Sequence, residues 1–170
     1  MSSATRTVDV LVTIDADYLL AHNDVSKSVS MLVNRDLIDS HASGDGLNGG
    51  DELWFDVNVG DNIRWRATTL SRNFDRIAMI TAVKQTSKES DGYLGKINID
   101  SPATLSGVVP YIDPKSTNGS GYSSTPVQYT LWPALAVEPG KLSYTITFVL
   151  LDRDLKSSQE YSWDPFITVN

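Results

Sequence analysis

The sequence predicts an all-β protein: an antiparallel β-sandwich of jelly-roll or Greek-key type with about ten short strands and little helix. Apolar and polar residues alternate over short runs, which is the pattern of half-buried strands. Gly, Pro, Asn and Asp separate these runs at short intervals. Asp outnumbers Glu by 17 to 4, and Asp favours turns and caps whereas Glu favours helices.

The clearest alternation occurs in the two runs 53–59 and 62–67. The Gly-Asp dipeptide at 60–61 lies between them and predicts a hairpin turn. Trp65 shares its strand face with Ile63 and is therefore expected in the core.

The remaining strand candidates are rich in β-branched and aromatic residues. They are Val8–Ile14, Ser28–Val33, Arg76–Val83, Leu94–Ile99, Leu105–Val109, Val127–Leu131, Leu142–Leu151 and Trp163–Val169. Asp17–Asp24 is expected to form one helical turn. The polar stretches Ser40–Asp51 and Lys115–Thr125 have no hydrophobic period and are expected to be mobile surface loops. No linker interrupts the chain, so residues 1–170 are expected to form one domain, with the first few residues disordered.

Composition excludes several classes of function. The formal charge is −7 and the basic residues are scattered, which argues against nucleic acid and anionic membrane surfaces as partners. No apolar stretch approaches the roughly 20 residues of a spanning helix, and the N-terminus does not resemble a signal peptide. There are no cysteines, which fits a reducing compartment. We therefore expect a cytoplasmic protein.

No catalytic constellation is recognisable, so we predict no enzyme, no catalytic residues and no cofactor. His22 and His41 are the two histidines, and no Gly-x-Ser-x-Gly elbow accompanies them. A carboxylate pair for glycoside hydrolysis stays open as an alternative, because its separation is spatial. Asp45, Asn48 and Asp51 offer oxygen ligands for calcium, but their spacing is not that of a helix–loop–helix site. Strand-terminating and turn-capping roles are favoured for them.

Two tryptophans are candidates for ligand binding. Trp54 falls on the strand face opposite Phe55 and Val57, and Trp132 precedes Pro133 at an expected strand end near a rim. An exposed indole can stack on a sugar ring, so a carbohydrate is the ligand considered.

Three segments carry a resemblance to a known family. They are Val-Asp-Val-Leu-Val-Thr-Ile-Asp at 8–15, Gly-Asp-Asn-Ile-Arg-Trp-Arg at 60–66 and Tyr-Ser-Trp-Asp-Pro-Phe-Ile-Thr-Val at 161–169. In their order they resemble the bacterial PixA/AidA proteins, the inclusion body protein family. The resemblance implies a small bacterial protein, for which accumulation in cytoplasmic inclusions or induction at high cell density are known behaviours, and it implies no catalytic residues. Inclusion-forming members are methionine-rich, whereas this chain has three methionines.

The leading hypothesis is a non-enzymatic bacterial protein that self-associates as a homodimer or larger assembly and binds a ligand, for which a carbohydrate is the candidate. Unpaired strand edges and Trp54 are the expected contacts of self-association. One alternative is a structural or storage inclusion protein without a small ligand. The other is a hydrolase with an unrecognised carboxylate pair.

Overall fold

The structure is a computed structural model that describes residues 5–115, 121–157 and 159–170. The disorder expected for the first few residues concerns positions 1–4, which lie outside the described residues. Within the described part, eleven strands dominate and helix is confined to short segments, so the all-β prediction is confirmed. None of the described helices is long and apolar enough to span a membrane.

The strands form two sheets. The first has the order β2-β1-β4-β8-β6, with β7 paired to β8. Its strands are β1 (Thr7–Ile14), β2 (Val29–Leu32), β4 (Asn62–Thr69), β6 (Lys96–Ile99), β7 (Ala103–Ile112) and β8 (Tyr122–Glu138). The second has the order β10-β9-β11-β3, with β5 paired to β9. Its strands are β3 (Trp54–Val57), β5 (Ile77–Gln85), β9 (Gly140–Leu151), β10 (Tyr161–Trp163) and β11 (Phe166–Val169).

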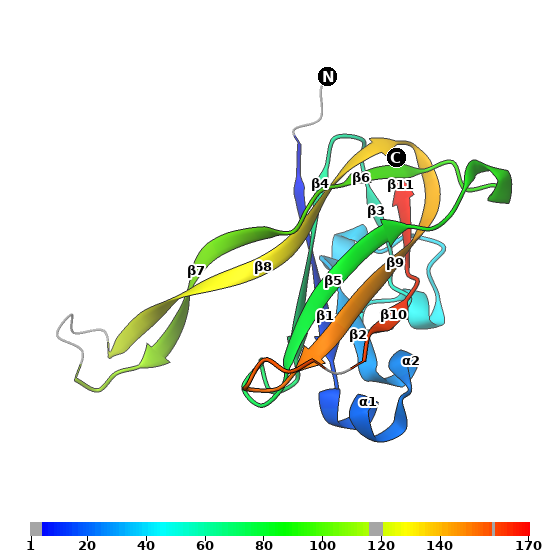
Figure 1. Ribbon diagram of the computed structural model, residues 1–170. Helices are drawn as coiled ribbons and strands as arrows, with labels where there is room; N and C mark the ends of the chain where they lie inside the picture. The colour runs from blue at the N-terminus through cyan, green and yellow to red at the C-terminus, as the bar shows by residue number, and fades with distance from the viewer. Residues whose placement is uncertain (1–4, 116–120, 158) are drawn as a thin grey trace.

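Two α-helices follow β1 at one end of the sandwich (Figure 1). They are α1 (Ala16–His22) and α2 (Val25–Ser28), capped by the carboxylates of Asp15 and Asp24. The short 3₁₀ segments are η1 (Arg35–Leu37), η2 (Gly44–Gly46) and η3 (Glu89–Asp91). The helical turn expected at Asp17–Asp24 thus lies within α1 and the capped start of α2.

The hairpin predicted at Gly60-Asp61 is wrong, because β3 and β4 belong to different sheets. The Asp61 carboxylate accepts hydrogen bonds from the backbone N–H groups of Asn58 and Arg6, and it pairs with the Arg6 guanidinium at 2.8 Å. These contacts fix a turn that carries the chain from one sheet to the other. Most ladders are antiparallel as expected, but β1 with β4 and β11 with β3 are parallel.

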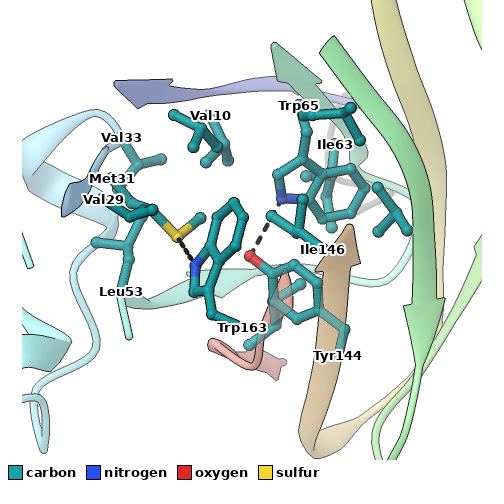
Figure 2. Close-up of a cluster of buried hydrophobic side chains, with 14 of the residues drawn as sticks. Val10, Val29, Met31, Val33, Leu53, Ile63, Trp65, Tyr144, Ile146 and Trp163 are labelled. Atoms are coloured by element: carbon teal, nitrogen blue, oxygen red, sulfur yellow. Dashed lines mark hydrogen bonds between the residues drawn. The ribbon is translucent and has the colours of Figure 1, made fainter. Parts of the chain in front are cut away.

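The core lies between the two sheets and contains most of the large apolar side chains (Figure 2). Trp65 is fully buried, as its phase predicted, and its indole N–H donates to the Tyr144 hydroxyl at 3.1 Å. The Trp163 indole N–H points at the Met31 sulfur, 3.3 Å away. Both polar tips in the core therefore have partners, which removes most of the cost of burying them.

Strands β7 and β8 form a hairpin that projects away from the packed sheets (Figure 1). Ten residue pairs join them, from Ala103↔Leu131 to Ile112↔Tyr122. The strand end predicted after Leu131 is therefore wrong, since β8 runs through Trp132 into the sandwich. The loop expected over Lys115–Thr125 is also shorter than predicted: Tyr122–Thr125 are strand, and 116–120 lie outside the described residues. The serine and threonine content of this segment is typical of a loop, and only its pairing with β7 makes it a strand.

Candidate functional site

The outer face of the second sheet gathers polar and aromatic side chains from three adjacent strands. Asp56 of β3 lies opposite Thr168 of β11, and Thr168 lies opposite Lys141 of β9. The neighbouring row holds Trp54 and Phe166. Side chains alternate along a strand, so these residues point outward while Phe55, Val57 and Ile167 enter the core.

Trp54 lies on the outer face, as predicted, but it does not present a free ring. The Lys141 ammonium stands 3.5 Å from the Trp54 ring centroid and 4.5 Å from that of Phe166. The His41 ring stacks near Trp54 at 6.1 Å, and the indole N–H donates to the Thr168 hydroxyl at 2.9 Å. Trp54 is thus engaged in a cation–π contact and a hydrogen bond, and sugar stacking would have to displace Lys141.

A carboxyl pair, the buried Asp39 and the half-buried Asp56, lies beside this tryptophan. Asp39 follows η1 and is 5% exposed. It accepts hydrogen bonds from the Thr168 hydroxyl at 2.6 Å and from the His41 backbone N–H at 2.7 Å. Its side chain is also hydrogen-bonded to Asp56. Two carboxyl groups in contact cannot both ionise freely, so the pair shares one proton at pH values below the raised pKa of Asp56.

The surroundings shift the pKa values of the two carboxyl groups in opposite directions. Burial raises the pKa of Asp56 to about 6, and the hydrogen bond and negative charge of Asp39 add to the rise. Burial also acts to raise the pKa of Asp39, but hydrogen bonds from Thr168, His41 and Asp56 outweigh it and hold that pKa below its ordinary value. Within the described residues no donor reaches the buried Oδ1 of Asp56, which fits a proton held by Asp56.

Neither histidine has the geometry of a nucleophilic triad. His41 Nδ1 lies 3.0 Å from Asp39 Oδ1 and 3.3 Å from the Ser40 hydroxyl, so both contacts fall on the same ring nitrogen. A triad needs them on opposite nitrogens. The Asp39–Asp56 pair is in direct contact, closer than the roughly 5–9.5 Å that separates glycosidase carboxylates. His22 stacks on Tyr18 at 4.1 Å and contacts that residue's carbonyl.

The three calcium candidates lie in one loop. The Asn48 amide binds the backbone of Val33, accepting from its N–H at 2.8 Å and donating to its carbonyl at 3.0 Å. Burial raises the pKa of Asp51, and the negative charge of Asp45 adds to the rise. Among the described residues no group of three or more histidine and acidic side chains could hold a metal ion. Asn48 instead ties the expected surface loop to the end of β2.

The projecting hairpin, which we call the arm (Ala103–Ile112 and Tyr122–Leu131), has a different character from the rest of the surface. It contains no Asp, Glu, Lys or Arg, in a chain of which 21% is charged. Its exposed apolar side chains include Ile112 at 79% and Val108 at 60%, with Leu105, Tyr111 and Tyr129 between about two-fifths and one-half exposed. Apolar side chains that project from a monomer without a covering layer are typical of an interaction surface.

A cleft of about 160 Å³, here the root cleft, opens where the arm leaves the sandwich. Trp132 lines it and donates its indole N–H to the Ile80 carbonyl at 3.0 Å. The other lining residues are Arg66, Ala67 and Asn73, then Ile77–Ile80 of β5, and Gln128, Tyr129 and Thr130 of β8. Trp132 therefore lies at a concave surface, although in mid-strand rather than at a strand end.

Comparison with protein families gives a match to the model described as PixA, inclusion body protein, over residues 6–169. The chain belongs to the PixA family of inclusion body proteins. The resemblance carried by the three sequence segments is thereby confirmed. Comparison with curated proteins gives no match.

Among solved structures, this PixA family member resembles the inclusion body protein PixA from Burkholderia cenocepacia J2315. The TM-score is 0.69 at 18% identity, and the match covers 100% of this chain and 99% of the other. That likeness shows the fold. Amebosin matches with a TM-score of 0.24 at 10% identity, over 69% of this chain and 88% of its own, which is too weak to carry an argument.

The sequence pattern indicated Trp54 as a candidate, but it did not indicate the carboxyl pair beside it or the arm. Asp39 and Asp56 lie 17 positions apart and meet only through sheet pairing. A detectable signal was Asp56 itself, a lone carboxylate inside an apolar strand. For the arm, the signal was the absence of charge over residues 116–137.

Proposed function

We propose that this protein functions by self-association and that the arm forms the contact between copies. The observation that supports this proposal most directly is an uncharged, projecting hairpin with exposed apolar residues on a chain of charge −7. Membership of the inclusion body protein family supports a function in assembly rather than catalysis.

Electrostatics favours the arm over other apolar sites. Phe74 and Leu155 are 77% and 68% exposed, but charged residues, including Asp75 and Arg153, surround them. Ten strand residues span about 33 Å, so contact through the arm holds two acidic bodies farther apart than the roughly 8 Å over which charges interact at physiological salt. The arm therefore lets acidic chains meet with little repulsion.

The contact uses the faces of the arm rather than its edges. Pro110 and Pro126 lie within the ladder, opposite Ser124 and Val108. Proline has no N–H to donate, so these pairs are the non-hydrogen-bonded ones and each outer edge lacks a donor at its proline. Extension of the sheet by a further strand is therefore disfavoured, and side-chain packing between faces supplies the association.

Sedimentation velocity at micromolar concentration and physiological salt tests the proposal. The wild type should sediment as a dimer or larger species, and the double variant Val108→Ser with Ile112→Ser as a monomer with an unchanged melting temperature. Phe74→Ser is the matched control, because its side chain is as exposed as Ile112, and it should associate like the wild type. A monomeric wild type at every salt concentration, or an arm variant that still associates, would contradict the proposal.

A further inference from the structure

The two faces of the arm differ, and the difference bears on what each face contacts. The even-numbered residues of β7 and their partners on β8 lie on one side of the hairpin, which we call the inner face. This side is continuous with the side of β8 on which Trp132 and Ala134 face the core. Near the body this inner face is polar, with Thr104, Ser106 and their partners Thr130 and Gln128. Toward the tip it becomes apolar, with Val108, Pro110 and Ile112. The inner face of the arm is therefore apolar at its tip and polar at its root, so the apolar tip residues have no apolar neighbours on the root of the same face.

The root cleft has both apolar and polar lining and lies beside the polar root of the same inner face. Ala67, Met79 and Trp132 supply apolar side chains, with Met79 40% exposed, and Asn73, Gln128 and Thr130 supply polar ones. The cleft volume of about 160 Å³ is close to that of a cavity known to hold a benzene ring, roughly 150 Å³. One branched aliphatic side chain of the size of isoleucine fits such a space.

We infer that the arm tip of one copy, centred on Ile112, docks in the root cleft of a second copy, and that the second copy's tip docks in the first. Two arms packed antiparallel along their full length place each tip at the other arm's root, so one two-fold axis satisfies both clefts. A tip cannot reach its own cleft, since about 33 Å of strand separates them. The inference rests on the proposed self-association and names its geometry.

The size of the contact lies near the lower limit of a standard interface. The inner face of the arm supplies ten strand residues, and nine further residues line the root cleft, which gives 19 residues on each copy. Standard protein–protein interfaces use about 20–30 residues a side.

Engineered disulfides test the docking, because the wild type contains no cysteine. Chains carrying Ile112→Cys and chains carrying Met79→Cys, with different tags, are mixed and mildly oxidised. A disulfide needs Cα atoms within about 7 Å, so it forms only if the tip of one copy reaches the cleft of the other. We expect the mixed 112–79 dimer to exceed either homodimer several-fold. Val59→Cys, which is exposed on the body, replaces Met79→Cys as the control and should give no excess.

The outcomes separate this inference from the proposed function. If the wild type sediments as a dimer but cross-links form chiefly between two Ile112→Cys chains, the arms run parallel and the inference is wrong while self-association stands. If the wild type is a monomer and no mixed cross-link forms, both are wrong. The substitution Met79→Lys should weaken the dimer without lowering the melting temperature, and an unchanged dimer would also overturn the docking.

Discussion

Replacing Asp56 with asparagine should stabilise the protein at high pH and have little effect at low pH. The amide introduced by Asp56→Asn would donate to Asp39 at every pH, as the protonated Asp56 does only below its pKa. Burial, together with the hydrogen bond and charge of Asp39, raises the pKa of Asp56 from 3.8 to about 6. The wild type must therefore release this proton as the pH rises, whereas the variant has none to release.

The sign and size follow from proton linkage. Below pH 3.8 both the folded and unfolded chains hold the proton, so it does not affect the free energy of unfolding. Between pH 3.8 and about 6 the folded chain binds more protons, so wild-type stability falls as the pH rises, and above 6 the loss is complete. About two pKa units at roughly 1.4 kcal/mol each give an upper bound near 3 kcal/mol. Because Asp56 is only half-buried, solvent screening reduces our expectation to about 1 kcal/mol.

Urea denaturation at pH 4 and pH 8 measures the effect. The gain in the free energy of unfolding for Asp56→Asn should be near zero at pH 4 and about 1 kcal/mol at pH 8. Asp100→Asn, an exposed position, controls for the general relief of negative charge. Asp39→Asn should instead destabilise at pH 8, because Thr168 and His41 lose a charged acceptor. Equal gains for Asp56→Asn at both pH values would refute the shared-proton account.

Three further predictions concern stability. Tyr144→Phe leaves the Trp65 indole N–H buried without its acceptor, and thermal unfolding should show a cost of about 1–3 kcal/mol; an unchanged melting temperature would contradict this. Truncation after Ser162 removes Trp163 and β11, which lies between β9 and β3, so the chain should be insoluble or lack a cooperative transition; a folded truncation with wild-type melting would refute it. Excess calcium should leave the melting temperature unchanged, because the Asn48 amide is engaged with the backbone of Val33; a rise reversed by chelator would show a site.

The strands, and which of their side chains face the core, could be predicted from the sequence because both depend on local alternation. Trp65 is buried and Trp54 lies on the outer face, as period two requires. The predicted runs 8–14 and 142–151 agree with β1 and β9 to within two residues. Turn positions were also visible, since Gly60-Asp61 lies between β3 and β4, and the predicted turn Glu138-Pro139-Gly140 contains Pro139, which separates β8 from β9.

Which strand pairs with which was decided only by the tertiary structure. A turn such as Gly60-Asp61 looks the same whether it closes a hairpin or crosses to another sheet, and here Arg6, 55 positions away, fixes the crossing. Asp39 and Asp56 acquire a shared proton only because the bridge between Ile38 and Phe55 brings them together in a half-buried setting. The arm likewise exists because β7 and β8 pair beyond the edge of the core. Period two fixes which way a side chain points, but contacts between distant segments fix what it meets there.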